Sequence, residues 1–223
     1  MVGTIANQDW WHAIEVQPGI VTPGWWDLRP TAEQIPWPDL AGKRCLDVGT
    51  ADGFWAFEME RRGAAEVVAS DIPSYFQSKA RARFEIAHEL LGSRVRYLES
   101  SVYDLEGEWD VVFMGYVLQV VTDPLGALEA VKRVCRGHVL VLDTISLPLC
   151  LLPSPLARLD ARRDGGEWFV FNRRGLRKAF ELSGWKVEAE SGIIRDRSLR
   201  ITSDDWKRRL GVRARSIAMR ASI

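Results

Sequence analysis

The stretch Cys45–Gly63, "CLDVGTADGFWAFEMERRG", decides the fold class. A short apolar run ends at an acid, a glycine-bearing loop follows, and the next residues have the apolar spacing of a helix. A strand that leads through such a loop into a helix is typical of nucleotide-binding α/β proteins. The stretch therefore predicts an α/β domain whose ligand lies beyond the carboxyl end of its first strand.

The chain after residue 42 continues this alternation of strands and helices. Apolar runs rich in Val, Ile and Leu indicate a mostly parallel, seven-stranded sheet with helices on both faces. The expected strands are residues 43–48, 66–70, 95–98, 109–115, 138–145, 185–191 and 213–222, and the expected helices are 52–62, 77–91, 124–135 (closed by Gly137) and 174–183. We therefore assign residues 43–223 to one core domain.

Residues 1–42 differ from this core. They hold five of the ten tryptophans and show no sustained helical or alternating period. We expect an irregular arm with a short helix near its start, packed by its aromatic side chains as a lid over the ligand site.

Composition excludes several classes of protein. Thirty basic and thirty acidic side chains give zero net charge, so nucleic acid is not a favoured partner, although residues 195–220 are rich in arginine. The three cysteines are too far apart for a disulfide framework or a zinc site, and we expect no metal. No signal peptide and no apolar run of membrane-spanning length are visible, which favours a cytoplasmic protein that does not contact membranes.

The loop after the first strand is unsuited to a dinucleotide. The fingerprint G-x-G-x-x-G is broken, because Gly49 is followed by Ala51 and Phe54. Asp52 stands where a pyrophosphate would need positive potential, and Asp47 ends the strand. Two carboxylates favour a cationic ligand and disfavour a nicotinamide-dependent reductase.

S-adenosylmethionine meets these demands, because it combines an adenosine with an ammonium and a sulfonium and has no phosphate. "DVGTADG" resembles motif I of the class I S-adenosylmethionine-dependent methyltransferases, which usually reads D/E-x-G-x-G-x-G, with Ala51 replacing the middle glycine. The family has a Rossmann-like fold, and its second acid, matched here by Asp71, binds both ribose hydroxyls. The resemblance implies these cofactor-binding residues: Asp47, Gly49, Thr50, Gly53, Asp71, Ile72, Ser101, Val102, Gly115, Tyr116 and Trp25.

A closer resemblance covers nearly the whole chain. Residues 10–29, 42–71, 84–98, 110–134 and 167–185 are similar to the branch that includes the tRNA wobble-uridine carboxymethyltransferases and many uncharacterised bacterial relatives. Two features depart from the tRNA enzymes. Gln119 and Val120 replace their Tyr-His pair, and Arg29 is the one cation of residues 1–42 that could meet the extra carboxylate of their cofactor. Ordinary methyl transfer is therefore favoured over carboxymethyl transfer.

Methyl transfer depends mainly on alignment, and a general base is needed only for a hydroxyl or a protonated amine. The candidate catalytic residues are His12 and Asp27. His12 has a suitable pKa for a base, but could equally hydrogen-bond within the arm. Asp27 could act as a base, orient the cofactor or cap a helix.

The expected acceptor pocket contains Trp26, Gln119 and Asp143, where Asp143 faces the site only if strand alternation allows it. Trp25 and Trp26 either wall the pocket or pack in the core. The apolar, proline-broken stretch 145–159 indicates an apolar or amphipathic small acceptor, or a homodimer contact.

The sequence thus predicts an S-adenosylmethionine-dependent methyltransferase that acts on oxygen or nitrogen of a small-molecule acceptor. One alternative is a tRNA wobble-uridine modifying enzyme, and a second is a non-catalytic S-adenosylmethionine-binding protein.

Overall fold

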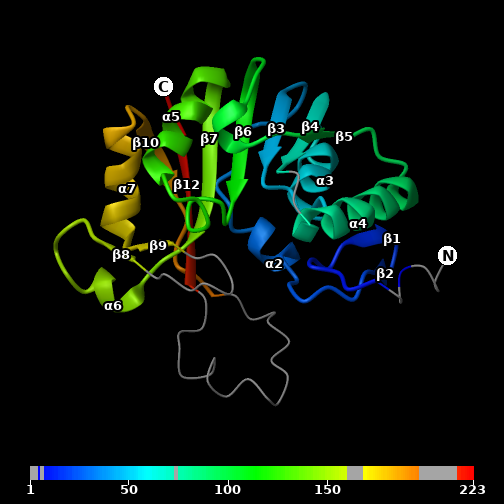
Figure 1. Ribbon diagram of the computed structural model, residues 1–223, viewed down its shortest axis with the longest axis horizontal. Helices are drawn as coiled ribbons and strands as arrows, with labels where there is room; N and C mark the ends of the chain where they lie inside the picture. The colour runs from blue at the N-terminus through cyan, green and yellow to red at the C-terminus, as the bar shows by residue number, and fades with distance from the viewer. Residues whose placement is uncertain (1–4, 6–7, 73–74, 160–167, 196–214) are drawn as a thin grey trace, which may run out of the picture.

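The computed structural model describes residues 5, 8–72, 75–159, 168–195 and 215–223, without the side chains of residues 75–78. Its centre is an eight-stranded sheet in the order β10-β12-β7-β6-β3-β4-β5, with β11 paired to β12 (Figure 1). The strands are β3 (Arg44–Val48), β4 (Glu66–Asp71), β5 (Arg96–Glu99), β6 (Trp109–Gly115), β7 (Cys135–Thr144), β10 (Lys186–Glu190), β11 (Ile194–Arg195) and β12 (Arg215–Ser222).

Helices cover both faces of this sheet, as the sequence predicts. They are α3 (Phe54–Arg61), α4 (Tyr75–Leu91), α5 (Pro124–Val134) and α7 (Arg173–Leu182). Side chains of α3 and α4 pack with Cys45 in one hydrophobic core, and those of α5 and α7 pack with Leu46 in the other. Successive residues of a strand thus point to opposite cores, which explains why the central strands are apolar throughout.

The strand order creates a topological switch point. The five strands β3, β4, β5, β6 and β7 are parallel to one another, and β3 lies between β4 and β6. β12 runs antiparallel between β7 and β10. A crevice forms where connections leave two neighbouring strands in opposite directions. The ligand site is therefore expected beyond the carboxyl ends of β3 and β6.

All seven predicted strands are present, and the structure adds one short strand, β11. One expectation about a helix end was wrong. The helix expected to extend to residue 135 ends at Val134, and β7 begins at once at Cys135. Gly137 is part of that strand rather than a helix stop. A glycine is needed there because a Cβ would lie 2.4 Å from the carbonyl oxygen of Asp110.

The N-terminal arm lies at the carboxyl edge of the sheet, beside α4 (Figure 1). It contains the hairpin β1 (Glu15–Gln17) and β2 (Ile20–Val21) and the short helix α2 (Arg29–Ala32). Trp10 and Leu28 are fully buried and join the core on the α3 side, so the aromatic packing is confirmed. The helix expected near the start of the arm falls largely outside the described residues.

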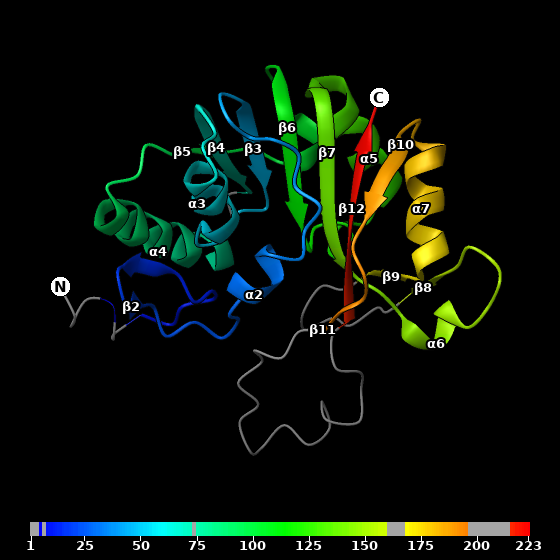
Figure 2. The ribbon, with the colours of Figure 1, turned by 180° about the vertical axis from the view of Figure 1, so that it is seen from behind.

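A second group of elements lies at the same edge, on the side of α7 (Figure 2). It consists of the short helix α6 (Leu147–Cys150) and the hairpin of β8 (Ala157–Leu159) and β9 (Phe169–Phe171). Most of the arginine-rich stretch 195–220 lies outside the described part of the chain. Within that part, no helix has the length and apolar character needed to cross a membrane.

Candidate functional site

The loop between β3 and α3 has an unusual backbone. Gly49, Ala51 and Gly53 have positive φ values of 74°, 49° and 96°. A Cβ on Gly49 would lie 2.8 Å from Cγ2 of Val117, in the loop after β6, so these two loops touch. The amides of Gly49 and Thr50 donate to the carbonyl oxygen of Ser70, at 2.8 and 3.0 Å. The loop is thereby fixed between the ends of β4 and β6.

Asp47 lies at the base of this loop and is fully buried. Neither carboxylate oxygen has a hydrogen-bond partner among the described residues. Burial raises the pKa of Asp47 to about 7; the nearby Thr50 hydroxyl and His12 act in the opposite direction, and the charge of Asp71 adds to the effect of burial. A buried carboxylate without a partner is costly, so the site fits a ligand that brings a cation such as the ammonium of S-adenosylmethionine.

Asp71 ends β4 and is 5% exposed. Its Oδ2 accepts a hydrogen bond from the Ala51 amide and its Oδ1 accepts one from the Ile72 amide, both at 2.8 Å. Burial nevertheless raises the pKa of this carboxyl. Each oxygen retains acceptor capacity, which fits the two ribose hydroxyls that the resemblance assigns to Asp71.

Asp52 has a role that sequence reasoning missed. Its Oδ2 accepts hydrogen bonds from the amides of Trp11 and His12, at 2.9 and 3.0 Å, and its Oδ1 contacts Nδ1 of His12. Nε of Arg83, on α4, lies 3.6 Å from Oδ2. Burial alone would raise the pKa of Asp52, but His12 and Arg83 outweigh it and hold the pKa below its usual value. Asp52 therefore anchors the arm to the loop.

His12 is held by this anchor. Its side chain is 8% exposed, and Nδ1 faces Asp52. Among the described residues, no group hydrogen-bonds to the other ring nitrogen, Nε2. Asp27, the second catalytic candidate, is paired with Arg29 at 2.7 and 2.8 Å. The hydrogen bonds from Arg29 lower the pKa of Asp27, which makes it a weaker base.

The arm also reaches the loop after β6. A bridge pairs His12 with Trp26, whose ring meets Tyr116 edge-on with centroids 5.5 Å apart. Tyr116 follows Gly115 and has a φ of 61°, held by a hydrogen bond of 2.7 Å from its amide to Leu142. Trp25 is 45% exposed, and its Nε1 donates to Asp9. Through Asp52 and Tyr116, the arm spans both sides of the switch point.

The segment after β5 occupies the position expected for an adenine edge. Ser101 caps a short 3-10 helix, η1 (Val102–Asp104), by accepting from the amide of Tyr103 at 3.2 Å. Val102 is buried, and the hydroxyl of Tyr103 donates to the carbonyl oxygen of Asp123 at 3.1 Å. The Ser101 hydroxyl therefore shapes this turn.

The two polar residues expected in the acceptor pocket lie next to each other. Asp143 is 1% exposed, and its Oδ2 accepts from the Gln119 amide at 3.2 Å. Oε1 of Gln119 is buried and has no hydrogen-bond partner in the described part of the chain. The carbonyl oxygen of Gln119 accepts from the Trp168 amide at 2.6 Å. Asp143 thus supports the loop after β6 rather than facing open space.

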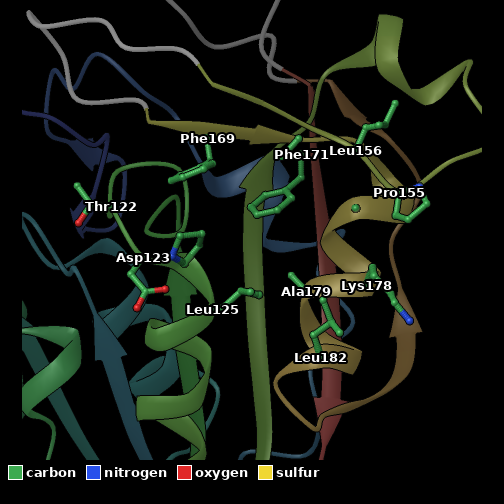
Figure 3. Close-up of a pocket in the computed structure, with 13 residues that line it drawn as sticks. Thr122, Asp123, Leu125, Pro155, Leu156, Phe169, Phe171, Lys178, Ala179 and Leu182 are labelled. Atoms are coloured by element: carbon green, nitrogen blue, oxygen red, sulfur yellow. The ribbon is translucent and has the colours of Figure 1, made fainter.

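A groove of about 420 Å³ begins at Thr122 and Asp123, which follow this loop (Figure 3). Its walls come from the start of α5, from β8 and β9, and from α7. The lining residues are Thr122, Asp123, Pro124, Leu125, Pro155, Leu156, Ala157, Phe169, Phe171, Gly175, Lys178, Ala179 and Leu182. Sequence reasoning found part of this wall in the apolar stretch 145–159, and missed the contribution of the two phenylalanines.

Comparison with known proteins agrees with this geometry. A family model described as a methyltransferase domain matches residues 27–190. The chain belongs to the class I S-adenosylmethionine-dependent methyltransferases. The resemblance found in the sequence is thereby confirmed, and S-adenosylmethionine is the cofactor of the family.

The similar proteins differ in what their names say they act on. A tRNA U34 carboxymethyltransferase from Campylobacter hominis is 28% identical over 161 residues, which cover 68% of this chain and 53% of the relative. A ubiquinone biosynthesis O-methyltransferase from Psychrobacter cryohalolentis is 34% identical over 125 residues, covering 54% of this chain and 46% of the relative. The chain thus spans about half the length of these relatives.

A solved structure of an S-adenosylmethionine-dependent methyltransferase from Mesorhizobium loti shares the fold. It superposes with a TM-score of 0.62 at 18% identity, over 88% of this chain and 97% of the other. This likeness confirms the Rossmann-like fold class.

Proposed function

We propose that this methyltransferase transfers the methyl group of S-adenosylmethionine to oxygen or nitrogen of a small-molecule acceptor. The observation that carries the proposal is Asp47, a fully buried carboxylate with no hydrogen-bond partner in the described residues, at the base of the glycine-bearing loop. A cationic ligand supplies what this carboxylate lacks. In this assignment Asp47 holds the ammonium and Asp71 holds the ribose hydroxyls.

The bound cofactor supplies an activated methyl group on a sulfonium, so the chain mainly has to position the acceptor and exclude water. The rings of Trp26, in the arm, and Tyr116, in the loop after β6, are in contact, and this assignment has them cover the cofactor. His12 is the proposed base for a hydroxyl acceptor. Asp52 holds a proton on Nδ1, which leaves Nε2 able to take a proton from the acceptor.

Ordinary methyl transfer, rather than carboxymethyl transfer, is supported by the position of Arg29. Its guanidinium lies 2.7 Å from Asp27 and 3.9 Å from Glu15, so it is already neutralised. A carboxylated cofactor would need an additional free cation near the crevice.

Calorimetry with the Asp71→Ala variant tests the assignment of the site. We expect the affinity for S-adenosylmethionine to fall by about tenfold or more, because both ribose hydroxyls lose their acceptor. Glu129→Ala, which removes an exposed acid of α5, serves as the control and should bind normally. Unchanged affinity of a folded Asp71→Ala protein would remove the ribose assignment.

A tRNA-modifying function is the second candidate, and similarity to the tRNA U34 carboxymethyltransferase favours it. Val120, which stands in place of a histidine of those enzymes, is 44% exposed in the loop after β6. A salt-dependent gel shift with tRNA would support this candidate. Formation of S-adenosylhomocysteine with any acceptor would exclude a protein that only binds the cofactor.

A further inference from the structure

The groove of Figure 3 is a site in its own right. We propose that it binds an apolar alkyl or aryl group of the methyl acceptor, which makes the acceptor amphipathic. This inference rests on the proposed function, since it names the class of acceptor. The volume of the groove, about 420 Å³, falls within the range of roughly 300–1,000 Å³ typical of small-molecule sites.

The loop after β6 lies between the glycine-bearing loop and the groove. Val117 contacts the glycine-bearing loop on one side, since a Cβ on Gly49 would lie 2.8 Å from its Cγ2. Two residues later, the carbonyl oxygen of Gln119 accepts from the amides of Trp168 and Phe169, at 2.6 and 3.4 Å. Thr122 then lines the groove. An acceptor bound in the groove would therefore have to pass this loop to present its reactive atom to the cofactor.

The lining favours an uncharged, apolar occupant. Phe169 and Phe171 stack at 6.5 Å on one side, and Leu125 and Leu182 face them from α5 and α7 (Figure 3). The two charged groups of the lining already have partners. Oδ1 of Asp123 caps α5 by accepting from the Gly126 amide at 2.8 Å, and Nζ of Lys178 lies 3.0 Å from Glu181. Neither therefore demands an ionic ligand.

The wall of the groove opposite α5 is fixed by the buried side chain of Asn172. Asn172 is fully buried, and its Oδ1 accepts from the amides of Leu156 and Gly175, at 3.0 and 2.7 Å. Its Nδ2 donates to the carbonyl oxygens of Leu149 and Ser154, both at 2.9 Å. All four hydrogen bonds of one amide fix the segment between α6 and β8 against the start of α7. The groove is thus preformed, as ligand sites usually are.

Apolar side chains at its rim would be exposed in the free protein. Leu182 is 63% exposed and Leu125 is 37% exposed. An apolar substituent of the acceptor would remove this surface from water, at about 25 cal/mol for each Å² buried. A homodimer contact would cover the same side chains, so the experiment has to separate the two.

Binding of N-phenyl-1-naphthylamine, a neutral apolar fluorophore, tests the groove directly. We expect one probe per chain, and Ala157→Trp should weaken binding by about tenfold or more because the indole fills the volume that the probe needs. Ala41→Trp, at an exposed alanine outside the groove, is the matched control and should leave binding unchanged. Equal binding by both variants would overturn the proposal.

Sedimentation of the Leu182→Asp variant distinguishes a homodimer contact from a ligand site. Leu98→Asp, at an exposed leucine of β5, is its control. A dimer that dissociates only in Leu182→Asp, with probe binding intact, would overturn the proposal. A monomeric wild type, together with weaker probe binding by about tenfold in Leu182→Asp alone, would support it. Probe binding to the groove does not require S-adenosylmethionine. Failure of the proposed function would show instead in the calorimetric measurement of S-adenosylmethionine binding.

A competition assay links the groove to acceptors. We expect phenols and carboxylic acids with an octyl chain to displace the probe about tenfold more strongly than the same compounds without the chain. This advantage should disappear in Ala157→Trp and persist in Ala41→Trp. If chain length has no effect on displacement, the groove does not select apolar substituents.

Discussion

The two ends of the glycine-bearing loop carry the same side chain in opposite circumstances. Asp47, near the end of β3, and Asp52, two residues before α3, are both fully buried. Asp47 has no hydrogen-bond partner in the described structure, and burial raises its pKa to about 7. Asp52 meets two amides, a histidine and an arginine, which hold its pKa below the usual value.

This difference separates a ligand site from a structural contact. A buried carboxylate costs free energy unless donors or cations within the protein compensate it. At Asp52 the arm and α4 compensate the charge, so the loop and the arm hold each other in place. At Asp47 the nearby groups of the protein do not offset the cost of burial, and a cationic cofactor can complete the site.

Neutralising each acid in turn is the strongest test of the difference between Asp47 and Asp52. Asp52→Asn should lower the free energy of unfolding at pH 7 by about 2–4 kcal/mol, because Arg83 and His12 lose a buried counter-charge. The contribution of Asp52 is fully present above the unfolded pKa of 3.8 and is lost as pH falls through the lower folded pKa. Urea unfolding at pH 7, followed by tryptophan fluorescence, measures the loss.

His12→Gln is the companion variant for this measurement. It removes the ring that contacts Asp52 but keeps the amide that donates to it, so the loss should be smaller than for Asp52→Asn. If Asp52→Asn unfolds at the same urea concentration as the wild type, Asp52 does not anchor the arm.

The same isosteric change at Asp47 should act in the opposite direction. Without cofactor, Asp47→Asn is expected to raise the free energy of unfolding at pH 8 by about 1–3 kcal/mol, since it removes a buried charge. The folded pKa of about 7 exceeds the unfolded value of 3.8, so the wild type loses stability as pH rises between these values. The variant should lack this slope between pH 4 and pH 7.

Affinity for S-adenosylmethionine should rise with pH over the range in which the stability of the cofactor-free protein falls. The ammonium of S-adenosylmethionine needs the ionised form of Asp47, so wild-type affinity should rise from pH 5.5 to pH 8. Asp47→Asn should bind weakly at both pH values. Calorimetry at the two pH values, together with thermal unfolding of the cofactor-free protein, distinguishes a ligand-binding acid from a merely buried one. A variant that loses stability at pH 8 would contradict the comparison.

The sequence was sufficient to place Asp47 and Asp71 at neighbouring strand ends, while their roles toward the cofactor stay a prediction. The apolar strand, Asp47 and the spacing to Asp71 are local patterns, and parallel strands must bring their carboxyl ends together. The anchor at Asp52 could not be predicted, because its partner His12 lies 40 residues away in a segment without a period. Gly137 was misinterpreted for a related reason: its close neighbour, Asp110, comes from the adjacent strand.

The groove also depended on contacts that are distant in sequence. The apolar stretch 145–159 was visible, but two explanations of it stayed open. The structure adds Phe169 and Phe171 from β9 and Leu182 from α7, which turn one apolar stretch into a concave site. The polar residue that shapes it, Asn172, has the ordinary sequence signature of a helix cap.

Ala51 provides the smallest and sharpest test, because it lies between the two acids and connects their environments. Its φ of 49° is left-handed, which costs a residue with a Cβ about 1 kcal/mol or more. Ala51→Gly relieves this cost but frees the unfolded chain, so we expect a net gain of about 0.5 kcal/mol in urea unfolding. Ala65→Gly, at an exposed alanine whose φ is not positive, should instead lose about 0.5–1 kcal/mol. Equal losses in both variants would mean that the left-handed conformation of Ala51, whose amide donates to Asp71, carries no strain in the loop between Asp47 and Asp52.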